Sequence, residues 1–398
     1  MPRRQARVPS ATRSSASGTF ECYAAAAPGL EKLVAGELTA LSVRPRLDEG
    51  GATFSGKIET VARANLWLRT ASRVVVRVAT FRAQAFHELE RLARAVAWER
   101  FVKAGAPVRF RVTSRKSRLY HTGAIEQRLA EAIEHRLGHA SVVARVSDSD
   151  EAEDSDTNAQ LFVIRVVHDV FTVSADSSGA LLHQRGYRQA IGKAPLRETL
   201  AAAMLIAAGW DGSVPMIDPM CGSGTIPIEG ALLARRMAPG LRRSFAFLEW
   251  PEADAKMWAK LREEAEQVAL PSALSVIRGS DRDAGAIDAA RDNAERAGVS
   301  GDVQFAVRAL SAMEPDAEGR GSVVTNPPYG VRVGDVARLR DLYARFGQVL
   351  RVKCPGWLVV ILSANPRLDA ELRLPLEELS RTRNGGIPVR LLKAEVPA

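Results

Sequence analysis

One short stretch, residues 325–330 (TNPPYG), places an amide, two prolines and an aromatic ring together. It follows an apolar, β-branched run, residues 322–325, which is typical of the end of a buried parallel strand. Because proline has no N–H donor and a fixed φ, Pro327 and Pro328 cannot continue a strand ladder. We therefore expect the Asn326 side chain and the Pro327 carbonyl to project, without strand partners, from the end of a sheet.

These groups suit the alkylation of an amino group on a planar base. Such an amine is a poor nucleophile because its lone pair is delocalised into the ring. The Asn326 oxygen and the Pro327 carbonyl can hold its two N–H groups, and Tyr329 can stack on the ring and fix its approach. We expect Asn326, Pro327, Pro328 and Tyr329 to form the catalytic site. Taken alone, the four residues are equally compatible with an Asn-Pro-Pro turn that carries a surface tyrosine.

A glycine-rich loop, residues 218–225 (DPMCGSGT), lies between a predicted strand and a predicted helix. Its glycines let a ligand approach the backbone, and the start of the helix offers free N–H groups to a carboxylate. A carboxylate at the strand end can meet an ammonium group, so the loop suits the amino-acid tail of S-adenosylmethionine. The residues expected to contact this cofactor are Asp218, Pro219, Cys221, Gly222, Ser223, Gly224 and Thr225. A dinucleotide loop is disfavoured by Pro227 at its third glycine position, and a Walker loop is excluded because no Gly-Lys-Ser/Thr follows.

The next predicted strand ends in residues 278–283 (RGSDRD). A carboxylate at this place holds ribose hydroxyls in doubly wound folds, so we expect Asp281, with Arg282 beside it, to contact the cofactor. Asp283 can instead cap the following helix. The distance along the chain from Gly222 exceeds the usual ~20 residues, which we explain by an inserted helical segment, residues 238–269. After the third strand, Ala309 stands where an acid or amide is expected to meet the adenine amino group.

The elements that must position these residues alternate regularly from residue 195 onward. The alternation predicts an α/β, Rossmann-like, doubly wound parallel sheet. The predicted segments are helix 196–208, strand 214–218, helix 226–236, strand 274–279, helix 284–297, strands 303–307 and 322–325, helix 339–350 and strand 356–363.

The region before residue 179 has shorter, mixed elements and predicts an α+β organisation. The predicted segments are a strand and helix within 20–41, strand 52–56, helix 58–68, strand 73–81, helix 86–101, strand 108–113 with its arginines outward, helix 122–137 and hairpin 161–175. We divide the 398-residue chain into a disordered basic arm (1–19), two small domains (20–80 and 81–178), a linker (179–194) and a catalytic domain (195–398). An acidic, low-complexity loop at 147–158 is expected to be disordered.

Basic charge is concentrated in the middle of the chain. Residues 63–136 hold 16 Lys/Arg and 6 Asp/Glu, a balance of +10, so the rest of the chain sums to 9 − 10 = −1. A local surplus of this kind is typical of a phosphate-binding surface, with solvated helix faces as the alternative. The residues expected to grip phosphates or stack on unpaired bases are Arg115, Lys116, Ser117, Arg118 and Tyr120, and the linker arginines Arg185 and Arg188.

Several classes of protein are disfavoured. No apolar run is long enough to span a bilayer, and the first 18 residues lack the apolar core of a secretory signal, although a cleaved organelle-targeting peptide is an alternative reading of them. Cys22, Cys221 and Cys354 form no CxxC unit, so we expect neither a disulfide framework nor a metal site. A monomer in the reducing cytoplasm fits these features.

With DPMCGSGTIPIEGA, GSDRD and TNPPYG in this order, the C-terminal half resembles amino-methyltransferases of the class I fold. PGLEKLVAGEL, RVTSRKSRLYHTGAIEQRL, QRGYR, APLRETLAAAML and NGGIPVRLL resemble, more closely, the THUMP-domain RNA guanine-N2-methyltransferases. The similarity covers nearly everything from Phe20 to Leu392.

The resemblance implies a ferredoxin-like segment and a THUMP domain that dock on structured RNA, followed by an S-adenosylmethionine-dependent catalytic domain. It implies further cofactor contacts at Pro195, Leu196 and Thr199, and a flipped-out guanine at residues 326–329. Members modify guanine 2445 of 23S rRNA or guanine 6 of tRNA, and the rRNA branch is favoured. Ala309 departs from the family pattern. A DNA adenine or glutamine acceptor, and a non-enzymatic RNA-binding assembly factor, are the alternatives.

Overall fold

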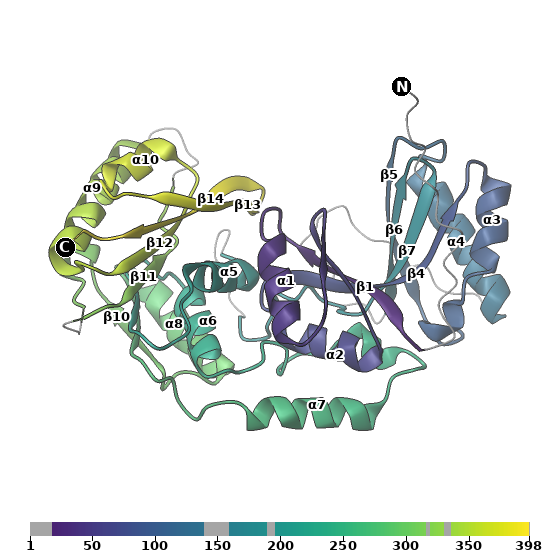
Figure 1. Cartoon of the computed structure of the whole chain (residues 1–398), viewed down its shortest axis with the longest axis horizontal. Coiled ribbons are helices and arrows are strands. Elements are labelled where there is room, and N and C mark those ends of the chain that lie inside the picture. The colour runs from purple at the N-terminus through teal and green to yellow at the C-terminus, as the bar shows by residue number, and fades with distance from the viewer. Residues whose placement is uncertain (1–17, 139–158, 189–195, 316–318, 330–335, 398) are drawn as a thin grey trace.

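A computed structural model describes residues 18–138, 159–188, 196–315, 319–329 and 336–397. Several sequence predictions therefore lie outside the described residues: nearly all of the basic arm, the acidic loop, the end of the linker, and the residues Pro195 and Gly330. The described residues form two seven-stranded sheets, each with its own helices, that lie side by side (Figure 1). We call them the N-terminal unit and the catalytic unit.

The N-terminal unit is built on one continuous sheet with strand order β2-β3-β1-β4-β7-β6-β5. Its strands are β1 (Phe20–Ala26), β2 (Arg46–Asp48), β3 (Gly51–Gly56), β4 (Ala71–Arg82), β5 (Val108–Arg115), β6 (Gln160–Val167) and β7 (Val170–Asp176). Its helices are α1 (Glu31–Ala40), α2 (Ile58–Trp67), α3 (Phe86–Arg94) and α4 (Thr122–Leu137), with a 3-10 turn at Trp98–Arg100. Strand β4 pairs with β1 on one side and β7 on the other, so the predicted boundary between residues 80 and 81 falls inside a shared strand.

The catalytic unit has strand order β10-β9-β8-β11-β12-β14-β13. Its strands are β8 (Met216–Asp218), β9 (Ile277–Asp281), β10 (Val303–Val307), β11 (Ser322–Thr325), β12 (Leu358–Ser363), β13 (Glu377–Asn384) and β14 (Ile387–Glu395). Its helices are α5 (Glu198–Ala208), α6 (Thr225–Ala234), α8 (Ala284–Ala297), α9 (Val336–Lys353) and α10 (Pro366–Glu371), with a 3-10 turn at Leu310–Ala312. The first five strands in this order are parallel, and β14 pairs with β12 antiparallel.

Alternation along the strands gives this sheet two buried faces. Val324 and Val360 share a hydrophobic cluster with α5, α6 and α8, whereas their neighbours Val323 and Val359 share another with α9 and α10. Successive side chains of a strand point to opposite faces, so helices cover both sides of the sheet. The predicted doubly wound fold is confirmed.

The inserted segment, residues 238–269, packs on the N-terminal unit rather than on the catalytic sheet. It contains a 3-10 turn (Ala246–Glu249) and α7 (Ala255–Gln267), which lies beside α2 and along the base of the molecule in Figure 1. Phe247 and Trp250 are buried in the core of the N-terminal unit. The Trp250 ring meets that of Phe101 edge-on at 5.0 Å, and its indole N–H donates to Gln160 Oε1 at 2.7 Å. The chain thus returns to its first unit after entering its second.

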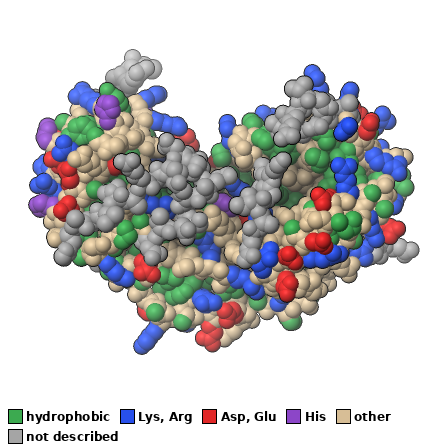
Figure 2. Space-filling model, turned by 180° about the vertical axis from the view of Figure 1, so that it is seen from behind, with side chains coloured by type: hydrophobic (Ala, Val, Ile, Leu, Met, Phe, Trp, Pro, Cys, Tyr) green, Lys and Arg blue, Asp and Glu red, His purple; other side chains and the backbone are tan. Residues whose placement is uncertain are grey.

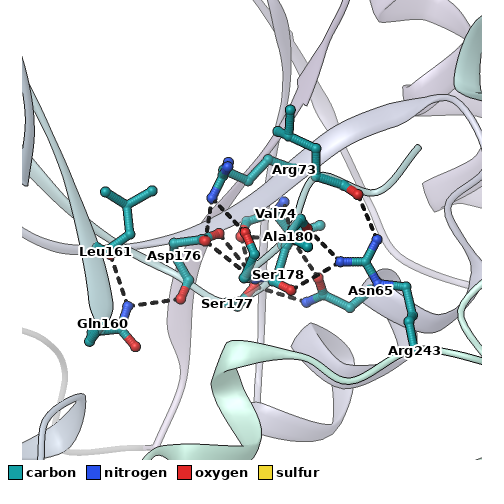
Figure 3. A network of polar contacts seen from close by, with 12 residues as sticks. Asn65, Arg73, Val74, Gln160, Leu161, Asp176, Ser177, Ser178, Ala180 and Arg243 are labelled. Atoms are coloured by element: carbon teal, nitrogen blue, oxygen red, sulfur yellow. Dashed lines mark hydrogen bonds and ion pairs between the residues drawn. The ribbon is translucent and has the colours of Figure 1, made fainter. Parts of the chain in front are cut away.

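A buried polar network holds the inserted segment and the start of the linker against the N-terminal sheet (Figure 3). Asn65 on α2 donates to Ser177 Oγ at 2.8 Å and accepts from Ser178 Oγ at 2.6 Å. Arg243, from the inserted segment, donates to the carbonyl of Ala180. Because unpaired polar groups are costly in a low-dielectric interior, such a network favours one arrangement of these segments.

Two local predictions were wrong, and one hairpin was not predicted. The helix predicted over 86–101 ends at Arg94 and is followed by a separate 3-10 turn. Arg109 on β5 is not directed outward: it is 3% exposed, buried within the unit. The antiparallel hairpin formed by β13 and β14 was not among the predicted strands.

The packing of Trp250 generates a prediction. Trp250→Ala should destabilise the N-terminal unit by about 3–5 kcal/mol, because it removes a large buried ring and leaves a cavity. Hydrogen exchange followed by mass spectrometry should show loss of protection in β1 and β6, with β8 and β12 unchanged. The matched control is Trp210→Ala, which removes a ring from the core of the catalytic unit. Loss of protection confined to the catalytic sheet in Trp250→Ala would contradict the assignment.

Candidate active site

The register of three parallel strands brings the candidate motifs to one edge of the catalytic sheet. Strand β8 pairs with β9 on one side, where Asp218 faces Gly279, and with β11 on the other, where Ile217 faces Val323. The carboxyl ends of parallel strands meet at the same edge, which is where ligands bind in such sheets. The glycine loop, Asp281 and residues 326–329, here called the NPPY residues, all follow these strand ends.

Asp218 is directly bonded to the strand that carries the NPPY residues. The Thr325 hydroxyl donates to Asp218 Oδ1 at 2.6 Å, and the Met220 N–H donates to the same oxygen at 3.1 Å. Asp218 is 1% exposed, and burial raises the pKa of its carboxyl to about 7, although the bond from Thr325 lowers it. Within the described part of the chain, no Lys or Arg forms an ion pair with Asp218. A ligand that brings a positive charge would therefore stabilise its ionised form.

The glycines of the loop are required by its backbone. Gly222 and Gly224 have φ of +51° and +82°, which favour glycine. A Cβ at Gly224 would also lie 2.8 Å from the Phe305 ring and 2.9 Å from Ala290. Gly224 is the N-cap of α6, and no described side chain caps this helix, so its first N–H groups face the loop.

Asp281 holds the loop in place. Its Oδ2 accepts from the Gly222 N–H at 3.1 Å, and its Oδ1 accepts from the Asp283 N–H at 3.0 Å. Asp283 caps α8 through Gly285 N–H at 2.9 Å, so the capping reading of Asp283 is confirmed. Arg282 is exposed next to them. The carboxylate of Asp281 thus already orders the loop and retains lone pairs for a hydroxyl ligand.

The side-chain oxygen of Asn326 lacks a hydrogen bond to any described residue. Its Oδ1 is buried and has no hydrogen-bond partner among the described residues. A buried acceptor without a partner costs about 1–3 kcal/mol, and native structures rarely contain one without a reason. Pro327 is buried, Pro328 is exposed, and Tyr329 is half-buried. Among the described residues, no group at this corner satisfies the oxygen.

Two residues of the site were missed by sequence reasoning. Thr325 supplies the bond to Asp218 described above. Asn384, at the end of β13, donates through Nδ2 to the Tyr329 hydroxyl at 2.7 Å and is 8% exposed. The only signal for Asn384 was its place before Gly385 and Gly386, which is typical of a hairpin turn.

The basic loop after β5 is exposed and held at its base. Arg115, Lys116 and Arg118 are exposed, and none forms an ion pair with another described residue. Tyr120 is 65% exposed, and its ring lies 4.2 Å from that of His121. Figure 2 shows Lys and Arg side chains along the upper rim of the lobe that holds β5 and α4.

Ser117 serves the loop itself. Its hydroxyl donates to the Arg115 carbonyl at 2.9 Å and accepts from the Asp169 N–H at 3.0 Å. Asp169 in turn accepts from the Arg118 N–H at 2.7 Å. Its hydroxyl therefore ties the loop to the turn between β6 and β7, and the contact of Ser117 with RNA stays a prediction.

The prediction that Arg185 contacts RNA is contradicted. Arg185 is 3% exposed, donates to the Arg69 carbonyl at 2.6 Å, and pairs with Glu229 at 3.4 Å. A phosphate cannot reach it because it lies in the interface of the two units, where Arg69 also donates to the Met237 carbonyl at 2.5 Å.

Arg188 also turns inward. It pairs with Glu198 at 3.3 Å and donates to the Leu196 carbonyl at 2.9 Å and the Thr225 hydroxyl at 2.5 Å. Its predicted contact with RNA is therefore corrected as well. Leu196, Thr199 and Thr225, three of the predicted cofactor residues, are buried beside the glycine loop or at the start of α5.

Much of the basic surplus in residues 63–136 is neutralised by acids from other segments. The pairs include Arg73 with Asp176, Arg77 with Glu21, and Arg100 with Glu252. The net positive charge counted from the sequence is therefore larger than the charge left unpaired. The unpaired charge is most evident on the loop after β5.

The described residues contain no group of three or more His, Cys, Asp or Glu side chains arranged to hold a metal ion. None of their helices is both long and apolar enough to cross a membrane.

Comparison with known proteins agrees with this geometry. Residues 185–392 match the family described as UPF0020, RMKL-like, methyltransferase domain, and residues 21–75 match the RlmL ferredoxin-like domain. The chain is 38% identical to the ribosomal RNA large subunit methyltransferase K/L of Syntrophotalea carbinolica over 94% of its own length and 53% of that protein. It is 33% identical to a putative RNA methyltransferase of Synechocystis sp., covering 97% of this chain and 99% of that one. The chain thus spans about half the length of several curated relatives that it matches.

Solved structures show the same arrangement. SMU.472, a putative methyltransferase complexed with SAH, has a TM-score of 0.83 and 30% identity, covering 96% of this chain and 99% of that one. A protein of Listeria monocytogenes described as a predicted N6-adenine-specific DNA methylase has a TM-score of 0.82 and 33% identity, covering 94% and 96%. Because the family model matches residues 185–392, which include the glycine loop, Asp281 and residues 326–329, the chain belongs to the RMKL-like family of methyltransferases.

Proposed function

We propose that this protein transfers a methyl group from S-adenosylmethionine to the exocyclic N2 of a guanine in structured RNA, with 23S rRNA as the substrate. The observation that carries the proposal is the buried Oδ1 of Asn326, which has no hydrogen-bond partner among the residues that the structure describes. An amino group of a base would give this oxygen the hydrogen bond that it lacks. The names of the relatives from Syntrophotalea carbinolica and Synechocystis sp. support RNA as the substrate class.

The residues present fit the cofactor. Asp218 is a buried carboxyl whose charge a ligand ammonium would balance, and the uncapped start of α6 offers N–H groups to a carboxylate. Asp281 lies at the end of β9, where it can accept from ribose hydroxyls. Pro195 lies outside the described residues, while Leu196 and Thr199 belong to the wall formed by the start of α5. When bound, S-adenosylmethionine supplies a sulfonium-activated methyl group.

The acceptor base is held by the NPPY residues. Asn326 Oδ1 and the Pro327 carbonyl accept from the amino group and orient its lone pair, and Tyr329 stacks on the extruded base. Extrusion from the RNA costs a few kcal/mol, which stacking offsets. No strong base is needed, because the amine loses its proton readily once it is methylated.

The alternatives differ in the acceptor or in the chemistry. A tRNA guanine fits the same four residues, and so does a DNA adenine, which the description of the Listeria monocytogenes protein names. The exposed basic loop with an aromatic residue favours RNA. A non-enzymatic RNA-binding factor is disfavoured by the intact Asp218, glycine loop and Asn326.

The first prediction concerns the acceptor pocket. Asn326→Ala should lower the rate of methyl transfer by about 100- to 1000-fold, the effect of removing one group aimed at the reacting centre. The measurement is transfer of labelled methyl groups to rRNA and tRNA transcripts, followed by digestion to nucleosides and identification of 2-methylguanosine. Calorimetry is the control: the variant should bind S-adenosylmethionine as the wild type does. N6-methyladenosine as the product, or full activity of the variant, would overturn the proposal.

The second prediction concerns Asp218 and pH. Its folded pKa of about 7 lies above its ordinary value of 3.8, so the folded state loses stability as pH rises from about 4 to 7 and the loss remains above 7. Asp218→Asn, which keeps an acceptor for Thr325, should therefore raise the free energy of unfolding at pH 8 by on the order of 4 kcal/mol. The gain should be absent at pH 3.5, where the carboxyl is protonated in the folded state and partly protonated in the unfolded chain.

The same substitution should weaken cofactor binding. Because the ammonium favours ionised Asp218, the affinity of the wild type for S-adenosylmethionine should rise from pH 6 to pH 7.5, whereas that of Asp218→Asn should be lower and nearly flat. Denaturant unfolding and calorimetry at each pH provide the measurements. A wild-type affinity independent of pH would refute the contact with Asp218.

The third prediction concerns the basic loop. The triple variant Arg115→Ala, Lys116→Ala, Arg118→Ala should weaken RNA binding and reduce the salt slope by about 2–3. At saturating RNA the rate of methyl transfer should stay close to that of the wild type. The control removes three basic residues of α7, Lys256, Lys260 and Arg262, and should leave both affinity and slope unchanged. Equal loss of affinity in the two variants would contradict a binding surface at this loop.

A further inference from the structure

Strand β13 connects the N-terminal unit to the tyrosine of the candidate acceptor pocket. One of its residues contacts the turn before α1, and its last residue contacts Tyr329. In Figure 1 the hairpin of β13 and β14 extends from the catalytic sheet toward α1. Neither contact takes part in the methyl-transfer chemistry described above.

The contact at the pocket is a single hydrogen bond. Asn384 Nδ2 donates to the Tyr329 hydroxyl at 2.7 Å, and Asn384 is 8% exposed. The Tyr329 ring packs at the edge of the hydrophobic cluster that includes Val389 and Leu391 of β14. Contacts with this cluster position the Tyr329 ring, and the bond to Asn384 positions the Tyr329 hydroxyl. A tyrosine that stacks on a base must keep one ring orientation, because approach geometry determines the rate.

The position of Asn384 is determined by the turn that follows it. Asn384 pairs with Ile387, so Gly385 and Gly386 form a two-residue hairpin loop. Their φ values are +52° and +85°, as a type I′ turn requires at both central positions. This turn matches the twist of its strands and leaves the backbone of Asn384 little freedom.

The contact with the N-terminal unit lies four residues earlier on β13. Ser380 Oγ donates to the Gly29 carbonyl at 2.8 Å. A Cβ at Gly29 would lie 2.1 Å from the Arg381 carbonyl oxygen, so the two backbones touch. Leu30, the next residue, is 1% exposed in the same hydrophobic cluster against which Tyr329 packs. The N-terminal unit is therefore seated directly on β13.

We propose that Asn384 is a positioning residue that orients the Tyr329 ring for the acceptor base, and that the seating of the N-terminal unit on β13 through Gly29 and Ser380 maintains this position. The inference rests on the proposed stacking of the base on Tyr329. It assigns to β13 a role in the reaction that is separate from cofactor binding and from the basic loop.

The test is a double-mutant cycle measured by methyl transfer to RNA. Asn384→Ala and Tyr329→Phe each remove one side of the same bond, so each should lower kcat by about 10-fold, the size of one hydrogen bond. If Asn384 acts through the Tyr329 hydroxyl, the double variant should be no slower than either single variant. KM for RNA and the affinity for S-adenosylmethionine should stay within about twofold of the wild type, since both substitutions leave the basic loop and the predicted cofactor residues unchanged. The control is Glu377→Gln at the exposed start of β13, which should leave kcat unchanged.

The seating on β13 is tested in the same assay. Ser380→Ala should lower kcat by about 3-fold in the wild type, because the lost bond loosens the strand, and should cause no further fall in Tyr329→Phe. An additive loss in the double variants, or wild-type kcat in Asn384→Ala, would overturn the inference while leaving the proposed function intact. A wild type that methylates no RNA would instead overturn the proposed function.

A second measurement does not depend on activity. The chain contains 5 tyrosines, so 3-fluorotyrosine labelling gives few resonances, and Tyr329→Phe assigns one of them. Asn384→Ala should shift and broaden this resonance, and Asn384→Asp, whose carboxylate can accept from the hydroxyl, should restore a single narrow line. An unchanged Tyr329 resonance in Asn384→Ala would refute the positioning role.

Discussion

The bond from the Thr325 hydroxyl to the buried carboxyl of Asp218 joins the two parts of the candidate active site. Asp218 begins the glycine loop, and Thr325 is the residue before Asn326. Because β8 and β11 are parallel neighbours, this bond sets the spacing between the groups that would hold the cofactor and those that would hold the acceptor. Burial of the carboxyl opposes its ionisation, so a positively charged ligand group would stabilise the ionised form of Asp218.

Several arginines of this chain have structural roles and are not available to bind a polyanion. Arg69, Arg185 and Arg243 donate to main-chain carbonyls at the junction of the N-terminal unit, the linker and the inserted segment. A guanidinium presents five donors in a planar fork, which suits the capture of several carbonyls in a crowded interface. Positive charge that remains available to a polyanion is found on the loop after β5, which Ser117 and Asp169 hold against the sheet.

The parts of the structure that could be predicted from the sequence are those determined by residues close together in the chain. The strand and helix segments 303–307, 322–325 and 284–297 have the predicted bounds, because apolar periodicity and capping residues lie within each segment. The glycine loop and residues 326–329 could be proposed as a site from the sequence because the residues of each set are consecutive in the chain. The inward direction of Arg185 depends on Glu229 and Arg69, which are distant along the chain. The proposed role of Asn384 depends on a fold that brings residues 329 and 384 together, and no local sequence pattern predicts this contact.

The return of the inserted segment to the N-terminal unit has a mechanical consequence. The chain passes between the two units three times: through the linker, out along the start of the inserted segment, and back after α7. A single connection would allow swivelling, but three connections around a buried interface resist rotation about any one of them. The span from the basic loop to the acceptor corner is then a nearly constant length. Under the proposed function, the nucleotide would be selected by its distance in space from the RNA element that the basic loop binds.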